Sequence, residues 1–246
     1  MTRLVQAELR KLWTTRTARV LLALTAAGTA ALVTLVLALA GRPGQPALGD
    51  DALRQLVLVP NGPLTLAALI LGVLGMAGEF RHGTATSTFL VTPVRGRVVA
   101  AKLAAAAGLA MALVAAAVGL AIGLPWLHAK GIEVGLADPG LGLRVAGLGA
   151  AAALYAVLGT GLGAVFRNQF AALVVGLLWL HGVEAVVVGM LHRPGLGRWL
   201  PEGAATALTA PGDGTLAMWA GGLVFAAYGL VLALLGARLV VRRDLT

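Results

Sequence analysis

The chain has 246 residues, of which 59% are hydrophobic and only 12% are charged, and its formal net charge is +9. Soluble globular domains carry about a quarter charged residues, so this composition excludes a water-covered domain and predicts a protein embedded in a membrane. The absence of Cys excludes disulfides, thiolate catalysis and Cys-based metal sites.

Residues 1–19, with the sequence MTRLVQAELRKLWTTRTAR, predict an amphipathic interfacial helix. Its apolar side chains fall on one half of a helical wheel, with Arg3 and Arg10 opposite, and Glu8 breaks the pattern. We expect this helix to lie at the headgroups with Trp13 at the membrane interface. The alternative is a basic leader that only sets topology. A cleaved signal peptide is disfavoured, because the apolar run that follows, 20–40, is longer than the roughly 7–15 residues of a signal peptide.

Six apolar segments have about the 20 residues that a helix needs to cross a bilayer. They are residues 20–40, 57–78, 98–124, 143–165, 170–190 and 216–240. Pro60 and Pro63 interrupt the start of the second, which predicts a kinked or re-entrant turn. No segment alternates apolar and polar residues as a barrel strand does. We therefore expect one all-α, polytopic membrane domain over residues 1–246, with six transmembrane helices.

The Lys and Arg residues predict the orientation. An even number of spans places both termini on one side, where thirteen of the nineteen Lys and Arg residues fall, against six on the other side. The positive-inside rule then places both termini in the cytoplasm. The positive net charge could indicate a nucleic-acid partner, but this distribution fits lipid headgroups better.

The connection between the second and third predicted spans, residues 79–97, is unusually polar and faces the cytoplasm in this orientation. Glu79 and Arg81 are two residues apart and cannot face each other on one helix, so we expect partners elsewhere in the connection or on another protein. Phe89 and Leu90 are expected to contact the membrane surface. Thr92 followed by a proline predicts the start of the third helix.

Basic residues follow this predicted start, namely Arg95, Arg97 and Lys102. A helix dipole disfavours cations at an N-terminus, so lipid headgroups or the acids of a partner protein would explain them better. The alternative for the whole connection is an ordinary loop whose arginines only enforce topology.

Polar residues elsewhere are few. His181 and Glu184 share a face of the fifth predicted span and are candidates for a translocation path or gate, although two ligands make a poor metal site. Asn168 and Gln169 are expected to cap helix ends. The two Gly-x-x-x-Gly patterns, at 119–123 and 159–163, predict close helix packing within the chain. The proline-rich residues 191–215 predict an external re-entrant or interfacial segment.

Several stretches resemble the bacterial ABC-2 type transporter permeases, the membrane subunits of ATP-driven exporters. The most specific is GVLGMAGEFRHGTATSTFLVTPVRGRVVAAKL, residues 72–103. Supporting likenesses are FRNQFAALVVGLLWLHGVE at 166–184, GRWLPEGAATALT at 197–209, the start RLVQAELRKLWTTR and the end VVRRDLT. Together they cover most of the chain in order.

The resemblance implies that the connection at 79–97 holds a short coupling helix that docks on a separate ATPase subunit. The docking residues would be Glu79, Arg81, His82, Gly83, Thr84, Thr86 and Thr88. It also implies a bacterial cell-membrane location, a second permease chain, identical or related, and Mg-ATP bound by the partner. The residues agree on one point, because the chain has no G-x-x-x-x-G-K-[ST] phosphate loop and no cofactor motif.

The residues also bear on two other function classes. A membrane enzyme is disfavoured, because the chain has no H-E-x-x-H or G-x-S-x-G motif and a single Ser. A secondary transporter or channel that works without an ATPase remains the alternative. Such a carrier typically shows inverted repeats and charge at mid-membrane, and Glu184 is the one clear candidate for such a charge.

Overall fold

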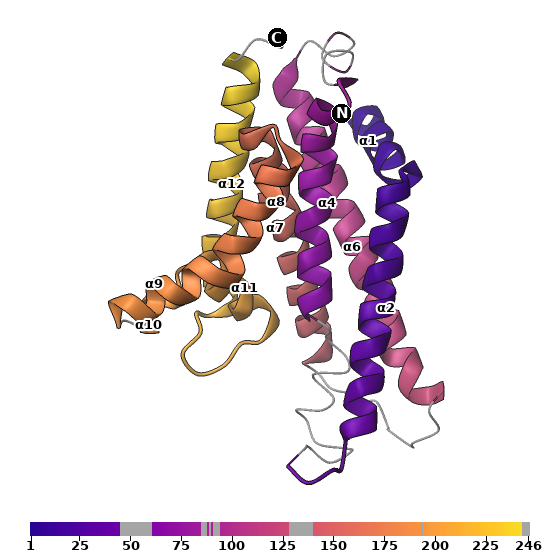
Figure 1. Ribbon diagram of the computed structural model, residues 1–246, viewed down its shortest axis with the longest axis vertical. Helices are drawn as coiled ribbons and strands as arrows, with labels where there is room; N and C mark the ends of the chain where they lie inside the picture. Colours follow the sequence, from indigo (N-terminus) through magenta and orange to yellow (C-terminus); the bar gives the residue numbers. More distant parts are fainter. Residues whose placement is uncertain are drawn as a thin grey trace.

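The computed structural model describes residues 1–44, 61–84, 88, 90, 94–127, 140–192 and 194–242, and every element in these ranges is a helix (Figure 1). Among the described residues, five helices are long and apolar enough to cross a membrane. They are α2 (Arg16–Leu39), α4 (Asn61–Arg81), α6 (Arg95–Leu127), α7 (Leu141–Phe166) and α12 (Met218–Arg242). The predicted all-helical, multi-pass membrane architecture is therefore confirmed at this level.

The predicted amphipathic helix is present as α1 (Thr2–Thr14) and ends earlier than expected. Thr15 has an extended backbone, which separates α1 from α2, and its side chain accepts a hydrogen bond from the backbone N–H of Ala18 at 3.4 Å. Leu9 and Leu12 on α1 pack against the core of the bundle. The apolar side of α1 is thus covered in part by protein.

The centre of the bundle is the pair α4 and α7, which approach closely through glycines. A Cβ atom added to Gly159 would collide with the backbone oxygen of Leu69, and one added to Gly72 would collide with that of Ala156. The predicted close packing is therefore confirmed for the second Gly-x-x-x-Gly pattern. It is wrong within this chain for Gly119 and Gly123, which are exposed and have open space where a Cβ would lie.

The fifth predicted span is not one continuous α-helix. It consists of α8 (Gln169–Leu178), a π-helical turn η1 (Trp179–Val183) and α9 (Glu184–Leu191), and α9 leads away from the bundle (Figure 1). Asn168 caps α8 as predicted. Its Oδ1 accepts hydrogen bonds from the backbone N–H groups of Phe170 and Ala171, at 2.9 and 3.1 Å. Gln169 is instead the first residue of α8 and makes a side-chain contact with α4.

The predicted external segment, 191–215, contains α10 (Pro194–Gly197) and α11 (Pro201–Thr209). Helix α11 is largely buried and packs against α7 and α12. Its last residue, Thr209, accepts a hydrogen bond from Nδ2 of Asn61 at the start of α4, at 2.9 Å. The start of α1 and the end of α12 (Met218–Arg242) lie at one end of the molecule (Figure 1); we call this the termini end.

Candidate functional site

Four charged side chains from three helices meet near the termini end and form what we call the ion-pair cluster. Its members are Glu8 and Lys11 of α1, Glu79 of α4 and Lys102 of α6. Glu8, Glu79 and Lys102 are buried, with 6%, 8% and 3% of their surfaces exposed. Charged residues are almost never buried this deeply unless they are paired. The cluster therefore joins α1 to the two helices that flank the 79–97 connection.

Lys102 is the centre of the cluster. Its Nζ atom lies 2.7 Å from Oε2 of Glu8 and 2.8 Å from Oε1 of Glu79. It also donates a longer hydrogen bond, 3.3 Å, to the backbone oxygen of Gly75. These short contacts with two opposite charges compensate the ammonium group for the water that it loses on burial.

Lys11 completes the charge balance from the exposed side. Its Nζ atom lies 3.0 Å from Oε1 of Glu79 and 3.3 Å from Oε1 of Glu8. Burial alone would lower the pKa of Lys11, but the hydrogen bonds and the negative charges of Glu79 and Glu8 outweigh it and raise the pKa above its ordinary value. With two cations and two anions, the cluster is neutral, which suits its apolar surroundings.

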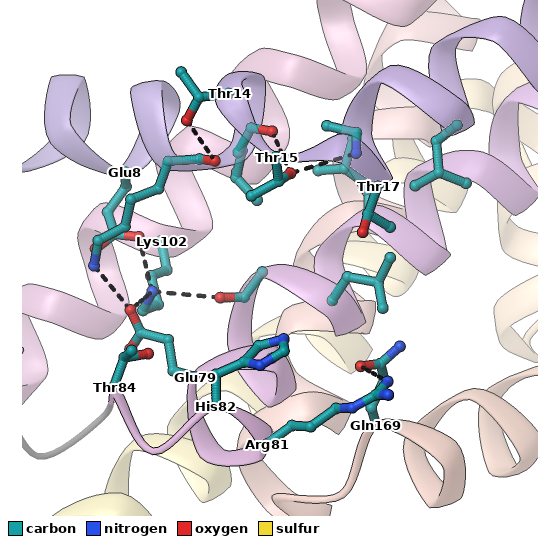
Figure 2. Close-up of a pocket in the computed structure, with 18 residues that line it drawn as sticks. Glu8, Thr14, Thr15, Thr17, Glu79, Arg81, His82, Thr84, Lys102 and Gln169 are labelled. Atoms are coloured by element: carbon teal, nitrogen blue, oxygen red, sulfur yellow. Dashed lines mark hydrogen bonds and ion pairs between the residues drawn. The ribbon is translucent and has the colours of Figure 1, made fainter.

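A cavity of about 480 Å³ opens beside the cluster. Figure 2 shows Thr14, Thr15 and Thr17 along one side of it, and Glu79, Arg81 and His82 along the other. Its apolar lining includes Leu21, Leu71 and Leu74. The cavity thus lies between the α1–α2 junction and the end of α4, where the chain enters the predicted docking connection.

The described part of that connection is largely exposed. Arg81, His82, Gly83 and Thr84 are all exposed, and Gly83 has the positive φ of +67° that glycine tolerates best. Arg81 donates a hydrogen bond to Oε1 of Gln169 at 3.3 Å, which joins the end of α4 to the start of α8. These four predicted docking residues are therefore accessible to another protein.

The other predicted residues of the connection divide into two groups. Thr88 turns inward to the ion-pair cluster, where its Oγ1 lies 3.4 Å from both Lys11 Nζ and Glu79 Oε1. Leu90 is 79% exposed, as a membrane-surface residue would be. Thr86, Phe89 and the predicted helix start at residues 92–93 lie outside the described residues, and so does the side chain of Arg95.

The structure corrects the predicted partners of two charged residues. Glu79 was expected to pair within the connection or with another protein, but its carboxylate is buried against Lys102 and Lys11. Lys102 was expected to face headgroups or a partner's acids, but it pairs inside the chain. The two corrections are linked, because Lys102 pairs with Glu79 and also with Glu8, the residue that breaks the amphipathic pattern of the N-terminal helix.

The predicted gate residues lie apart from the cluster. Glu184 is the first residue of α9 and is 5% exposed, and its carboxylate contacts α11. The side chain of His181 lies outside the described residues. Trp13, the predicted interface residue of α1, is 56% exposed. Within the ranges described, no group of three or more His, Asp or Glu side chains is arranged to hold a metal ion.

No protein-family model matches the chain. No curated protein matches it either.

Proposed function

We propose that this chain is the membrane-spanning permease subunit of an ABC-2 type exporter and that a separate ATPase subunit drives it. In this proposal the chain lies in the cytoplasmic membrane of a bacterium, with six crossings and both termini in the cytoplasm. The α8–η1–α9 segment serves as the fifth crossing and α10–α11 as the outer re-entrant element. Two permease chains would form the path for the cargo.

The observation that carries the proposal is the ion-pair cluster next to the α4–α6 connection. Lys102 joins Glu8 and Glu79 at 2.7 and 2.8 Å, so α1, α4 and α6 are held together where the connection begins. A force applied to the connection would therefore act on three helices at once. This is what an energy-coupling junction needs, because a flexible loop would absorb the movement instead of transmitting it.

The exposed residues at the end of α4 supply the docking surface in this proposal. Arg81, His82 and Thr84 are accessible at the termini end, while Glu79 acts from inside as an anchor and does not touch the partner. The fixed side chains of the cluster and the exposed side chains of the connection thus have different roles. Substituting the first kind should affect stability, and substituting the second kind should affect coupling.

The alternative, a carrier or channel that works without an ATPase, is supported by a different residue, Glu184. Glu184 is a buried carboxylate in the broken α8–α9 segment, and buried carboxylates in membrane proteins often mark proton or ion paths. A carrier of this kind would move cargo in vesicles without ATP. A permease would require both ATP and the ATPase.

The test is purification of the tagged chain from its native host, followed by identification of co-purifying proteins. We expect a polypeptide with a phosphate loop, whose ATP hydrolysis changes when the chain is added in lipid nanodiscs. Arg81→Glu should remove that response by reversing the charge at the docking surface, while Arg42→Glu, on an exposed arginine beyond the far end of α2, should leave it intact. Transport without any such ATPase, or equal responses in both variants, would contradict the proposal.

A further inference from the structure

A second group of polar side chains, separate from the ion-pair cluster, lies where α7, α9 and α11 meet. Glu184 stands directly after the π-helical turn, and its backbone N–H bonds to the oxygen of Trp179, five residues earlier. Such π turns are rare and occur frequently at functional sites. Only 5% of the surface of Glu184 is exposed, so the carboxylate is placed inside the protein.

The carboxylate of Glu184 caps another helix. Helix α11 begins at Pro201, and the residue before it, Leu200, has no side chain that can cap the free N–H groups of the first turn. Instead, Oε2 of Glu184 caps the helix by accepting a hydrogen bond from the backbone N–H of Glu202 at 3.0 Å. The other oxygen, Oε1, is buried and forms no hydrogen bond, although the Trp179 side chain approaches the carboxylate.

A second carboxylate lies in the same place. Glu202 is half-buried in the first turn of α11, and its Oε2 accepts a hydrogen bond from the hydroxyl of Tyr155 at 2.6 Å. Tyr155 is 4% exposed and its ring packs edge-on against Phe225. Three helices are thus joined by hydrogen bonds that converge on two acids.

No positive charge offsets these two acids among the residues that the structure describes. The salt bridges in these ranges all belong to the ion-pair cluster. Two other titratable or charged residues lie on the adjoining turns, His192 and Arg198. Both are exposed, and neither pairs with a carboxylate of this group. The side chain of His181 lies outside the described residues. On α7 and α11 the groups that face the pair are Tyr155 and the acids themselves.

A carboxylate as deeply buried as that of Glu184 loses its water, and a second acid beside it without a counter-ion makes its negative charge still more costly. Glu184 is the more deeply buried of the two acids, so its carboxyl group is the one that holds a proton in this arrangement. Oε1 of Glu184 is the oxygen free to hold it, since its hydrogen-bonding capacity is unused in this structure.

We propose that Glu184 and Glu202 form a proton-binding site that fastens α11 to α7 and α9. With one proton on Oε1 of Glu184, the pair carries a single negative charge, Oε2 still caps α11, and Tyr155 still donates to Glu202. Loss of the proton to water leaves two anions across the first turn of α11, and their repulsion loosens this turn. The site does not depend on the proposed exporter role, and it can be tested with the purified chain alone.

The experiment measures the thermal unfolding midpoint of the full chain in lipid nanodiscs between about pH 5 and pH 9. At the acid end of this range the folded protein holds a proton that the unfolded chain has lost, so the midpoint of the wild type should fall as the pH rises and the folded site loses this proton. Glu184→Gln keeps a cap oxygen and removes the charge, and it should flatten this dependence. Asp213→Asn, at an exposed acid, should keep the wild-type profile.

Infrared difference spectroscopy supplies a readout that packing alone would not change. A carbonyl band of a protonated carboxylic acid should appear in the wild type at low pH, disappear at high pH, and be lost in Glu184→Gln. Glu202→Gln serves the same purpose if the first variant does not fold. A wild type without a titrating band, or a midpoint that follows the sodium or potassium concentration and ignores pH, would overturn the proposal.

Discussion

Lys102 shows how a single residue in an apolar helix can organise the surrounding structure. It is the most deeply buried charge of the ion-pair cluster, and its ammonium group is within 2.8 Å of two carboxylates on two other helices. Lys11 contacts the same carboxylates, but half of its side chain is exposed. If Lys11 is lost, water can reach the carboxylates from the exposed side and replace much of its stabilising interaction. Water cannot replace the buried ammonium group of Lys102 in this way.

This difference leads to a prediction about stability. Lys102→Met leaves Glu8 and Glu79 buried with only one exposed cation, so it should lower the free energy of unfolding by about 3–5 kcal/mol, as for other broken buried pairs. Lys11→Met removes a partly exposed pair and should cost about 1 kcal/mol or less. Chemical unfolding in nanodiscs measures both. Equal losses in the two variants would show that Lys102 is not the centre of the cluster.

At the scale of elements, the contact between α4 and α7 depends on glycines. Gly72 and Gly159 let the two backbones approach until no Cβ fits between them. The pattern at Gly119 on α6 has the same spacing but faces open space. The same Gly-x-x-x-Gly motif is therefore tightly packed in α7 and exposed in α6. Substitutions of Gly159 and Gly119 can be compared directly for this reason.

Gly159→Ala should destabilise the protein by about 1–3 kcal/mol, because the new methyl group meets the backbone of α4 and the helices must move apart. Gly119→Ala adds the same methyl group to an exposed helical site, where alanine is favoured over glycine by up to about 1 kcal/mol. Unfolding midpoints of the two variants should therefore move in opposite directions. A neutral or stabilising Gly159→Ala would contradict the packing of α4 on α7.

The sequence predicted helices whose signals are local and continuous. The apolar runs that became α2, α6, α7 and α12 were placed to within a few residues, and Asn168 was recognised as a cap from its position alone. The break in the fifth apolar run was missed, because WLHGV has no proline and its π turn is not visible in hydropathy. The partners of Glu79 and Glu184 were also missed, since Lys11, Lys102 and Glu202 lie far from them in the chain.

At the scale of the whole molecule, the path of the chain explains why the start of α1 and the end of α12 lie at the same end. Five long helices alone would leave them at opposite ends. Figure 1 shows that α8 and α9 lead the chain away from the termini end, and α12 returns it. The α8–η1–α9 segment thus reverses the chain direction between α7 and α12.

The measurement that tests the account most directly is the side of the membrane on which the α4–α6 connection lies. The chain has no Cys, so a single cysteine can be placed at the exposed His82 or, as a control, at the exposed Asp213. In intact cells a membrane-impermeant maleimide should label Asp213→Cys and leave His82→Cys unlabelled, and inside-out vesicles should give the reverse. Labelling of His82→Cys from outside the cell would place the connection beyond the reach of any ATPase and contradict the proposed function.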